Sequence, residues 1–177
     1  NKNELIKALD GQTYKLDESM TVISDNKQVH AIGGVMGGEI SGCSEQTTNV
    51  FLEVALFDPI SISKTGRKLN LQSDARYRFE RGLDPNSVEL GLNAATKMIC
   101  DLCGGEISKI TSSGNNIIPK KIINFSFDKV DKIGGIKINK NYQKKILTKL
   151  GFKTSKEKNN KCPITIPSFR SDIDGEA

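Results

Sequence analysis

The 177-residue sequence has no tryptophan, a single histidine, His30, and only 6% aromatic residues. No apolar run is long enough to span a bilayer, and the first residues lack the layout of a signal peptide. We therefore expect a cytoplasmic protein without a membrane partner.

Cysteine is also scarce. The four cysteines include one C-x-x-C pair, Cys100 and Cys103, but the sequence has no second pair at zinc-ligand spacing. The pair falls within a predicted helix, where reduced cysteines pack as small apolar residues. The lack of a disulfide framework fits a reducing cytoplasm.

Charge and hydrophobicity are those of an ordinary globular chain, at 27% charged and 36% hydrophobic residues. Lysine and arginine number 26 against 21 aspartates and glutamates, for a net charge of +5. This mild excess permits contact with nucleic acid through phosphate neutralisation but does not require it.

The most informative stretch runs from Gly33-Gly34-Val35-Met36-Gly37-Gly38 to Glu53, which lies in the apolar run of residues 49–57. One interpretation is a tight hairpin followed by a half-exposed strand, with Glu53 at its solvated rim. The other is a pocket, because a backbone without Cβ atoms can turn through positive φ and approach a ligand closely. On an alternating strand, Glu53 would share a face with Phe51 and Ala55.

The remaining patterns predict an α+β fold, with a mixed or antiparallel sheet and packed helices followed by a small helix-turn-helix-like domain. The predicted hairpins cover residues 5–16, around Asp10-Gly11, and residues 20–32. Cap and proline signals, apolar periodicity and glycine stops predict helices at residues 59–68, 85–103, 128–133 and 139–150, and a turn or short helix at residues 75–79 capped by Ser73. Residues 161–167 read as extended.

A polar, turn-rich run without periodicity separates two predicted domains, residues 1–110 and 120–177, as a linker over residues 111–119. Two groups of cations have alternative interpretations, either a solvated face with salt bridges or contact with a nucleic-acid backbone. The first group is Lys64, Arg67, Lys68, Arg76, Arg78 and Arg81. The second group is Lys137, Lys140, Lys144, Lys145 and Lys149.

Three segments together resemble the β-subunit family of bacterial phenylalanine–tRNA ligases. The first runs from the glycine stretch through Thr47-Thr48-Asn49-Val50-Phe51-Leu52-Glu53 to Phe57-Asp58-Pro59-Ile60. The second is Ser73-Asp74-Ala75-Arg76-Tyr77-Arg78-Phe79-Glu80-Arg81-Gly82-Leu83-Asp84-Pro85, and the third is Ile166-Pro167-Ser168-Phe169-Arg170-Ser171-Asp172-Ile173. The resemblance covers nearly the whole chain and is to the interior of a longer subunit.

The resemblance implies that residues 1–110 are the C-terminal part of an editing domain, which hydrolyses tyrosine wrongly attached to the phenylalanine tRNA. A second site of this kind is needed because a phenylalanine pocket rejects tyrosine incompletely. The family's glutamate, which accepts the phenolic hydroxyl, corresponds to Glu53. The glycine wall corresponds to Gly34 and Gly37, and the hydroxyl and alanine positions correspond to Ser73 and Ala75.

The sequence departs from the family at two positions, with serine at residue 73 where threonine is more common and glycine at residue 33 where alanine is common. The family's site also uses histidine, arginine and asparagine side chains that precede residue 1. We therefore expect the isolated chain to hold one wall of a pocket and to be inactive alone.

The parent implied by the resemblance is a class II aminoacyl-tRNA synthetase that attaches phenylalanine to tRNA with ATP and Mg²⁺. Its partners are tRNA and a catalytic α subunit, in a heterotetramer of two α and two β subunits. Asp172 corresponds to the first acidic residue of a Mg²⁺ cluster, although we expect no cofactor on this chain by itself. The alternative is a stand-alone nucleic-acid-binding module of helix-turn-helix type without catalysis.

Overall fold

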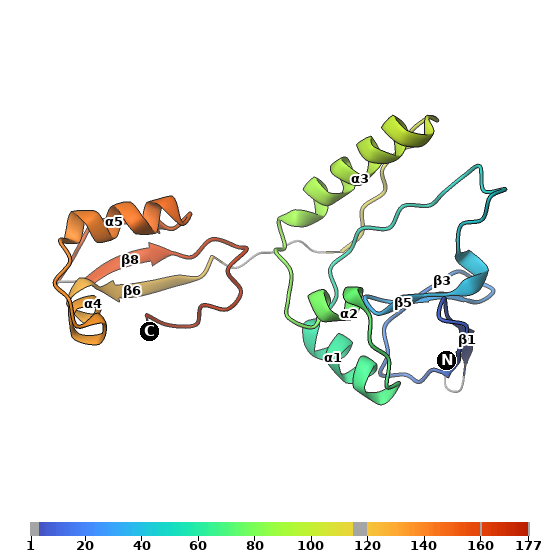
Figure 1. The fold of residues 1–177 in the computed structure, drawn as a ribbon, viewed down its shortest axis with the longest axis horizontal. Coiled ribbons are helices and arrows are strands. Elements are labelled where there is room, and N and C mark those ends of the chain that lie inside the picture. The colour runs from blue at the N-terminus through green and yellow to red at the C-terminus, as the bar shows by residue number, and fades with distance from the viewer. Residues whose placement is uncertain (1–3, 115–119, 160, 177) are drawn as a thin grey trace. The chain divides into compact units, whose positions relative to one another are not determined.

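The computed structural model describes residues 4–114, 120–159 and 161–176, which form two compact units (Figure 1). One unit contains Asn1–Leu83 and Ser87–Lys109, and the other contains Asp84–Asn86 and Ile110–Ala177. The predicted linker over residues 111–119 stays a prediction, and its residues 115–119 lie outside the described part. Within that part, no helix is both long and apolar enough to cross a membrane.

The first unit begins with the two predicted antiparallel hairpins. Its strands are β1 (Leu5–Lys7), β2 (Thr13–Lys15), β3 (Val22–Ser24), β4 (Val29–Ile32) and β5 (Met36–Gly37). Strand β1 pairs with β2, while β4 lies between β3 and β5 in a second sheet. The first turn depends on Gly11, whose φ of 79° lies in the left-handed region that favours glycine.

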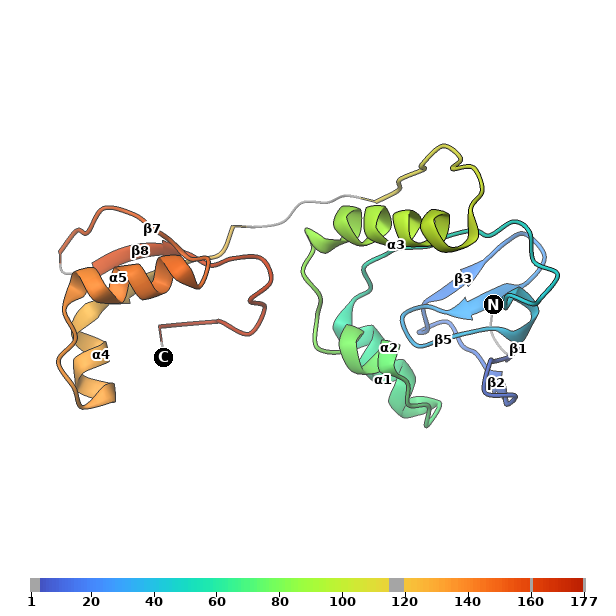
Figure 2. The same ribbon diagram turned by 45° about the horizontal axis from the view of Figure 1, so that its top comes forward.

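Two short helices follow, and their predicted caps are confirmed. Helix α1 (Pro59–Lys68) begins where the Asp58 carboxylate accepts a hydrogen bond from the Ser61 N–H at 2.7 Å. Helix α2 (Asp74–Phe79) begins at Ser73, whose Oγ accepts from the Arg76 N–H at 3.0 Å. The two helices pack against each other, as both views show (Figures 1 and 2).

Two predictions for this unit are wrong in part or in full. The alternating strand over residues 49–57 does not form: after the 3₁₀ turn η1 (Glu39–Ser41), residues 42–58 contain no helix or strand. Extended backbone needs a neighbouring strand for its hydrogen bonds, and none of the described strands pairs with this segment. Helix α3 (Ser87–Cys103) ends as predicted but begins two residues after Pro85.

The core of the first unit lies between the hairpins and α1. Ile32, Val35 and Ile62 are each only 1% exposed, and Phe57 and Phe79 pack at the edge of this cluster with ring centroids 5.1 Å apart. Burial of an isoleucine side chain stabilises a fold by about 1.5–3 kcal/mol. These contacts therefore hold the glycine turn between β4 and β5 against α1.

The second unit has the order β6 (Ile122–Ser126), α4 (Phe127–Gly134), α5 (Lys140–Lys149), β7 (Lys153–Thr154) and β8 (Lys161–Thr165). The two helices and the extended segment confirm the predicted elements, and strands β6 and β7 are additions. Strand β8 pairs with both β6 and β7. Phe127 and Ile164 form the centre of a separate small core, so the chain as a whole is an α+β protein.

Candidate functional site

The glycine turn is tightly packed on its inner side. Gly34 has a φ of 66°, and a Cβ atom there would lie 2.9 Å from Ile62 Cδ1 and 2.9 Å from Phe57 Cδ2. A Cβ at Gly37 would lie 3.1 Å from Leu9 Cδ1. Larger side chains would therefore strain the turn at Gly34 and displace Leu9 at Gly37.

Ser73 ties helix α2 to this turn. Its Oγ donates a hydrogen bond of 2.5 Å to the Val35 carbonyl oxygen while it caps α2 by accepting from Arg76 N–H. Ala75 follows in the first turn of the same helix and is half-buried. Gly34 and Ser73 thus lie at the contact between the turn and α2, and Ala75 lies in the first turn of that helix.

Arg76 holds α2 on α1, a role that its assignment to the cationic group did not reveal. Its guanidinium passes over Gly66, where a Cβ would lie only 2.2 Å from Nε. It donates to the Leu71 carbonyl at 2.8 Å and to Glu80 at 3.0 Å. The side chain is 13% exposed, so Arg76 is a structural residue rather than a solvated one.

Glu53 lies in the irregular segment, four residues before Phe57. Its side chain is exposed, yet partial desolvation by the surrounding chain raises the pKa of its carboxyl. It has no hydrogen-bond or ion-pair partner within the part of the chain that the structure describes. A carboxylate without such a partner can accept a hydrogen bond from a hydroxyl group.

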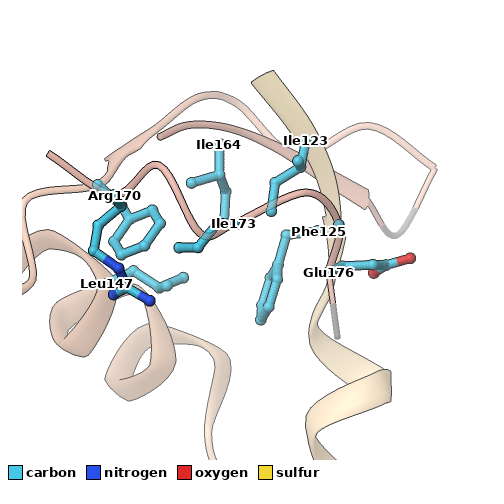
Figure 3. A pocket seen from close by; sticks show the side chains of 9 residues that line it. Ile123, Phe125, Leu147, Ile164, Arg170, Ile173 and Glu176 are labelled. Carbon is cyan, nitrogen blue, oxygen red and sulfur yellow. The ribbon is translucent and has the colours of Figure 1, made fainter. Parts of the chain in front are cut away.

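Two shallow, open surface cavities lie on the described residues, and neither is lined by the predicted pocket residues. One, of about 200 Å³, lies in the second unit between apolar side chains such as Phe125, Leu147 and Ile173 (Figure 3). The other, of about 330 Å³, runs along α1. Neither of these two cavities brings together Gly34, Gly37, Glu53, Ser73 and Ala75, and their role as one wall of a pocket stays a prediction.

The neighbourhood of Asp172 does not fit a Mg²⁺ site. Both carboxylate oxygens accept from the Arg170 guanidinium at 2.8 Å, and this pairing lowers the pKa of Asp172 to about 2. The nearby acids are also engaged, Asp174 by Lys121 and Glu176 by the Ser126 N–H. Among the described residues, no three His, Cys, Asp or Glu side chains are grouped to hold a metal ion.

The two parts of the sequence on either side of residue 119 differ strongly in charge. Residues 1–119 carry 12 lysines and arginines against 15 aspartates and glutamates, a net charge of −3. Residues 120–177 carry 14 against 6, a net charge of +8. The overall charge of +5 therefore conceals a strongly basic C-terminal part.

Each of the two parts of the chain matches the model of a known domain family. Residues 1–104 match the model of the B3/4 domain, and residues 123–177 match that of the tRNA synthetase B5 domain. The chain is thus built from domains of an aminoacyl-tRNA synthetase.

Similar proteins identify the synthetase. The chain is 44% identical over 174 residues to the phenylalanine–tRNA ligase β subunit of Rhodopseudomonas palustris, covering 98% of this chain and 22% of that protein. The β subunit of Wolbachia sp. subsp. Brugia malayi is 42% identical over 173 residues, which are 98% of this chain and 22% of that protein. The β subunit of Cereibacter sphaeroides is 46% identical over 174 residues, which are 98% of this chain and 21% of that protein. The chain belongs to the phenylalanine–tRNA ligase β-subunit family and spans about a fifth of the length of these relatives.

The structure adds three residues that the sequence interpretation did not assign to the candidate site. Phe57 and Ile62 pack against Gly34, and Arg76 fixes the helix that carries Ser73 and Ala75. Ile60 and Ile62 are the two isoleucines of the otherwise polar helix α1, and only the structure shows that Ile62 faces inward. The sequence likewise offers no signal for the closeness of Arg76 and Gly66.

Proposed function

We propose that this chain forms part of the editing domain of a cytoplasmic class II phenylalanine–tRNA ligase. The parent enzyme attaches phenylalanine to tRNA with ATP, acts as a heterotetramer with two α subunits, and hydrolyses mischarged tyrosyl-tRNA. The chain alone is expected to be inactive, because its predicted site residues shape the pocket and bind the substrate but do not form a complete catalytic group.

The observation that carries this proposal is the hydrogen bond between Ser73 Oγ and the Val35 carbonyl. It joins two sequence motifs, 38 positions apart, that the family resemblance assigns to one pocket. The close packing of Gly34 against Phe57 and Ile62 supports the same location, since it keeps the turn in a fixed shape.

Glu53 is proposed to select tyrosine. Its unpartnered carboxylate accepts the phenolic O–H, a group that phenylalanine lacks. A hydrogen bond to a charged acceptor contributes about 1.5–3 kcal/mol, which corresponds to about a ten- to hundredfold preference. Gly34 and Gly37 form the backbone wall of the proposed pocket, close-packed on Ile62 and Leu9, and Ser73 fixes the turn beside Ala75.

The test uses the complete ligase carrying Glu53→Ala. We expect hydrolysis of tyrosyl-tRNA to lose about ten- to a hundredfold in kcat/KM, while attachment of phenylalanine is unchanged. The measurement is the rate of each reaction with purified enzyme.

Glu45→Ala is the matched control, because Glu45 is another exposed glutamate of the same irregular segment. It should leave both rates unchanged. Unimpaired clearance of tyrosine by Glu53→Ala would show that Glu53 is only a rim carboxylate.

We assign the requirement for ATP and Mg²⁺ to the parent ligase. For Asp172 to serve as a Mg²⁺ ligand, its bidentate pair with Arg170 must open and further acidic ligands must join it. No step of the editing proposal depends on this ion.

The charge of residues 120–177 favours a second candidate function, nucleic-acid binding by the helix-turn-helix-like unit. The outward face of α5 carries Lys145 and Lys149, which have no acidic partner among the described residues, whereas Lys140 and Lys144 pair with Glu157. A basic face of this kind binds phosphates with strong salt dependence.

This second function is tested with the chain and an unrelated nucleic-acid duplex. Lys145→Gln with Lys149→Gln should reduce the salt dependence of binding by a slope of about 2, one for each lost phosphate contact. Lys140→Gln is the control, since that lysine is already neutralised. Absence of binding at low salt would remove this candidate.

A further inference from the structure

The cavity along α1 in the first unit belongs to neither proposed function. Its volume is about 330 Å³, and its lining residues are Pro59, Ile60, Ser63, Lys64, Arg67 and Glu80. The lining therefore combines an aliphatic corner, a hydroxyl group, two cations and one carboxylate. We call this cavity the α1 notch.

The six cations of the first group defined from the sequence differ in whether they have an acidic partner in the structure. Lys68 is paired with Asp17 at 2.5 Å, and Arg76 and Arg81 are both paired with Glu80. Lys64, Arg67 and Arg78 have no acidic partner among the described residues, and all three are exposed, but Arg78 belongs to α2. The two available cations of α1 are thus the two that line the notch.

Glu80 does not cancel their charge. Its Oε2 lies 3.0 Å from Arg76 Nε, and its Oε1 lies 3.2 Å from Arg81 Nη1, so two guanidinium groups share one carboxylate. The notch and its immediate neighbours therefore keep an excess of positive charge. An anionic ligand is favoured there.

The notch also lies at a useful distance from the candidate site. Glu80 caps the C-terminal end of α2, and Ser73 caps its N-terminal end. Seven residues at about 1.5 Å each separate the two caps by about 10 Å. Nucleotides of one strand rise by about 3.4 Å each, so this distance corresponds to about three stacked nucleotides.

We propose that the α1 notch binds phosphodiester groups next to the 3′ end of the tRNA whose aminoacyl group enters the editing site. Lys64 and Arg67 neutralise the phosphates, and Pro59 and Ile60 contact a ribose or base. This inference rests on the proposed editing function and adds to it the surface that holds the RNA.

The test uses the complete ligase with Lys64→Gln and Arg67→Gln combined. Two phosphate contacts to a single strand each contribute a salt slope of about 0.7. We expect the KM for tyrosyl-tRNA to rise about tenfold at 0.1 M salt, with kcat unchanged, and the salt dependence of kcat/KM to weaken by about 1.4 in slope.

Two controls accompany this variant. Lys68→Gln changes an adjacent cation of the same helix that Asp17 already neutralises, and it should leave KM and the salt slope unchanged. Hydrolysis of a phosphate-free substrate, tyrosine esterified to adenosine, should be equal for the double variant and the unmodified enzyme.

The outcomes separate the two proposals. If the unmodified ligase does not hydrolyse tyrosyl-tRNA, the editing function fails, and this inference fails with it. If hydrolysis proceeds but the double variant keeps its KM and salt slope, only the notch proposal is wrong. Loss of activity on the adenosine ester would also overturn it, because the two side chains would then act through the fold rather than through phosphates.

Discussion

Helices α1 and α3 of the first unit contrast in how much they bury. Helix α1 has 10 residues, mostly polar, yet it buries Ile62, Thr65 and Gly66. Helix α3 has 17 residues and the clearest apolar stripe in the sequence, yet it has no buried residue, and Leu102 is 79% exposed. Apolar periodicity therefore indicates that a helix forms, while the burial of its apolar face depends on a partner surface.

The largest expected effect tests this contrast in the core. Ile62→Ala should destabilise the fold by about 2–5 kcal/mol, because it removes a fully buried side chain and leaves a cavity. Leu102→Ala should change stability by about 0.5 kcal/mol or less. Urea unfolding of the two variants is the measurement. Equal losses would mean that the face of α3 is buried in solution.

Two helical glycines allow a second comparison. Gly66→Ala places a Cβ 2.2 Å from Arg76 Nε, so the guanidinium must move, and overpacking of this kind costs about 1–3 kcal/mol. Gly91→Ala in α3 meets only Val54 at 3.6 Å and should stabilise the helix by about 0.5–1 kcal/mol. Thermal midpoints that shift in opposite directions would support the difference, and a shift in the same direction would contradict it.

Ser73 tests the connection between α2 and the glycine turn. Ser73→Ala removes both the helix cap and the bond to Val35, at a cost of about 0.5–2 kcal/mol. Ser73→Thr keeps the hydroxyl and should restore most of that stability. Chemical unfolding of both variants decides the point. A threonine variant as unstable as the alanine variant would show that space, and not the hydrogen bond, determines this position.

The smallest effect concerns acid stability. The hydrogen bond from Lys68 at the end of α1, together with bonds from Ser19, lowers the pKa of Asp17 to about 2. A carboxyl with a depressed folded-state pKa stabilises the fold above its usual value of 3.8, and this stabilisation is lost as pH falls towards 2. Asp17→Asn should flatten the fall of the thermal midpoint in this window. An unchanged acid profile would mean that the exposed pair contributes nothing.

Local signals in the sequence predicted most of the helices and hairpins. Asp58 before Pro59 and Ser73 before α2 each cap the predicted helix, because capping needs only a side-chain oxygen beside the first free N–H groups. The strand expected around Glu53 was wrong for the opposite reason. A strand needs a hydrogen-bonding neighbour, and alternation of residue types does not supply one.

The sequence by itself determined the helix caps, the glycine turn between β4 and β5, and the membership of a synthetase family. Each of these depends on residues near one another along the chain or on the order of motifs. Charge composition belongs to the same group, since the excess of lysine after residue 120 can be counted directly.

Only the tertiary structure decided which cations remain available and which residues hold the candidate site. Arg76 is bound over Gly66 and Lys68 is paired with Asp17, while Lys64 and Arg67 line the α1 notch. The physical reason is that the ionic partner of a side chain is set by distances across the fold. Such distances depend on the packing of α1 against α2 and the hairpins, and residue spacing along the chain does not encode them directly.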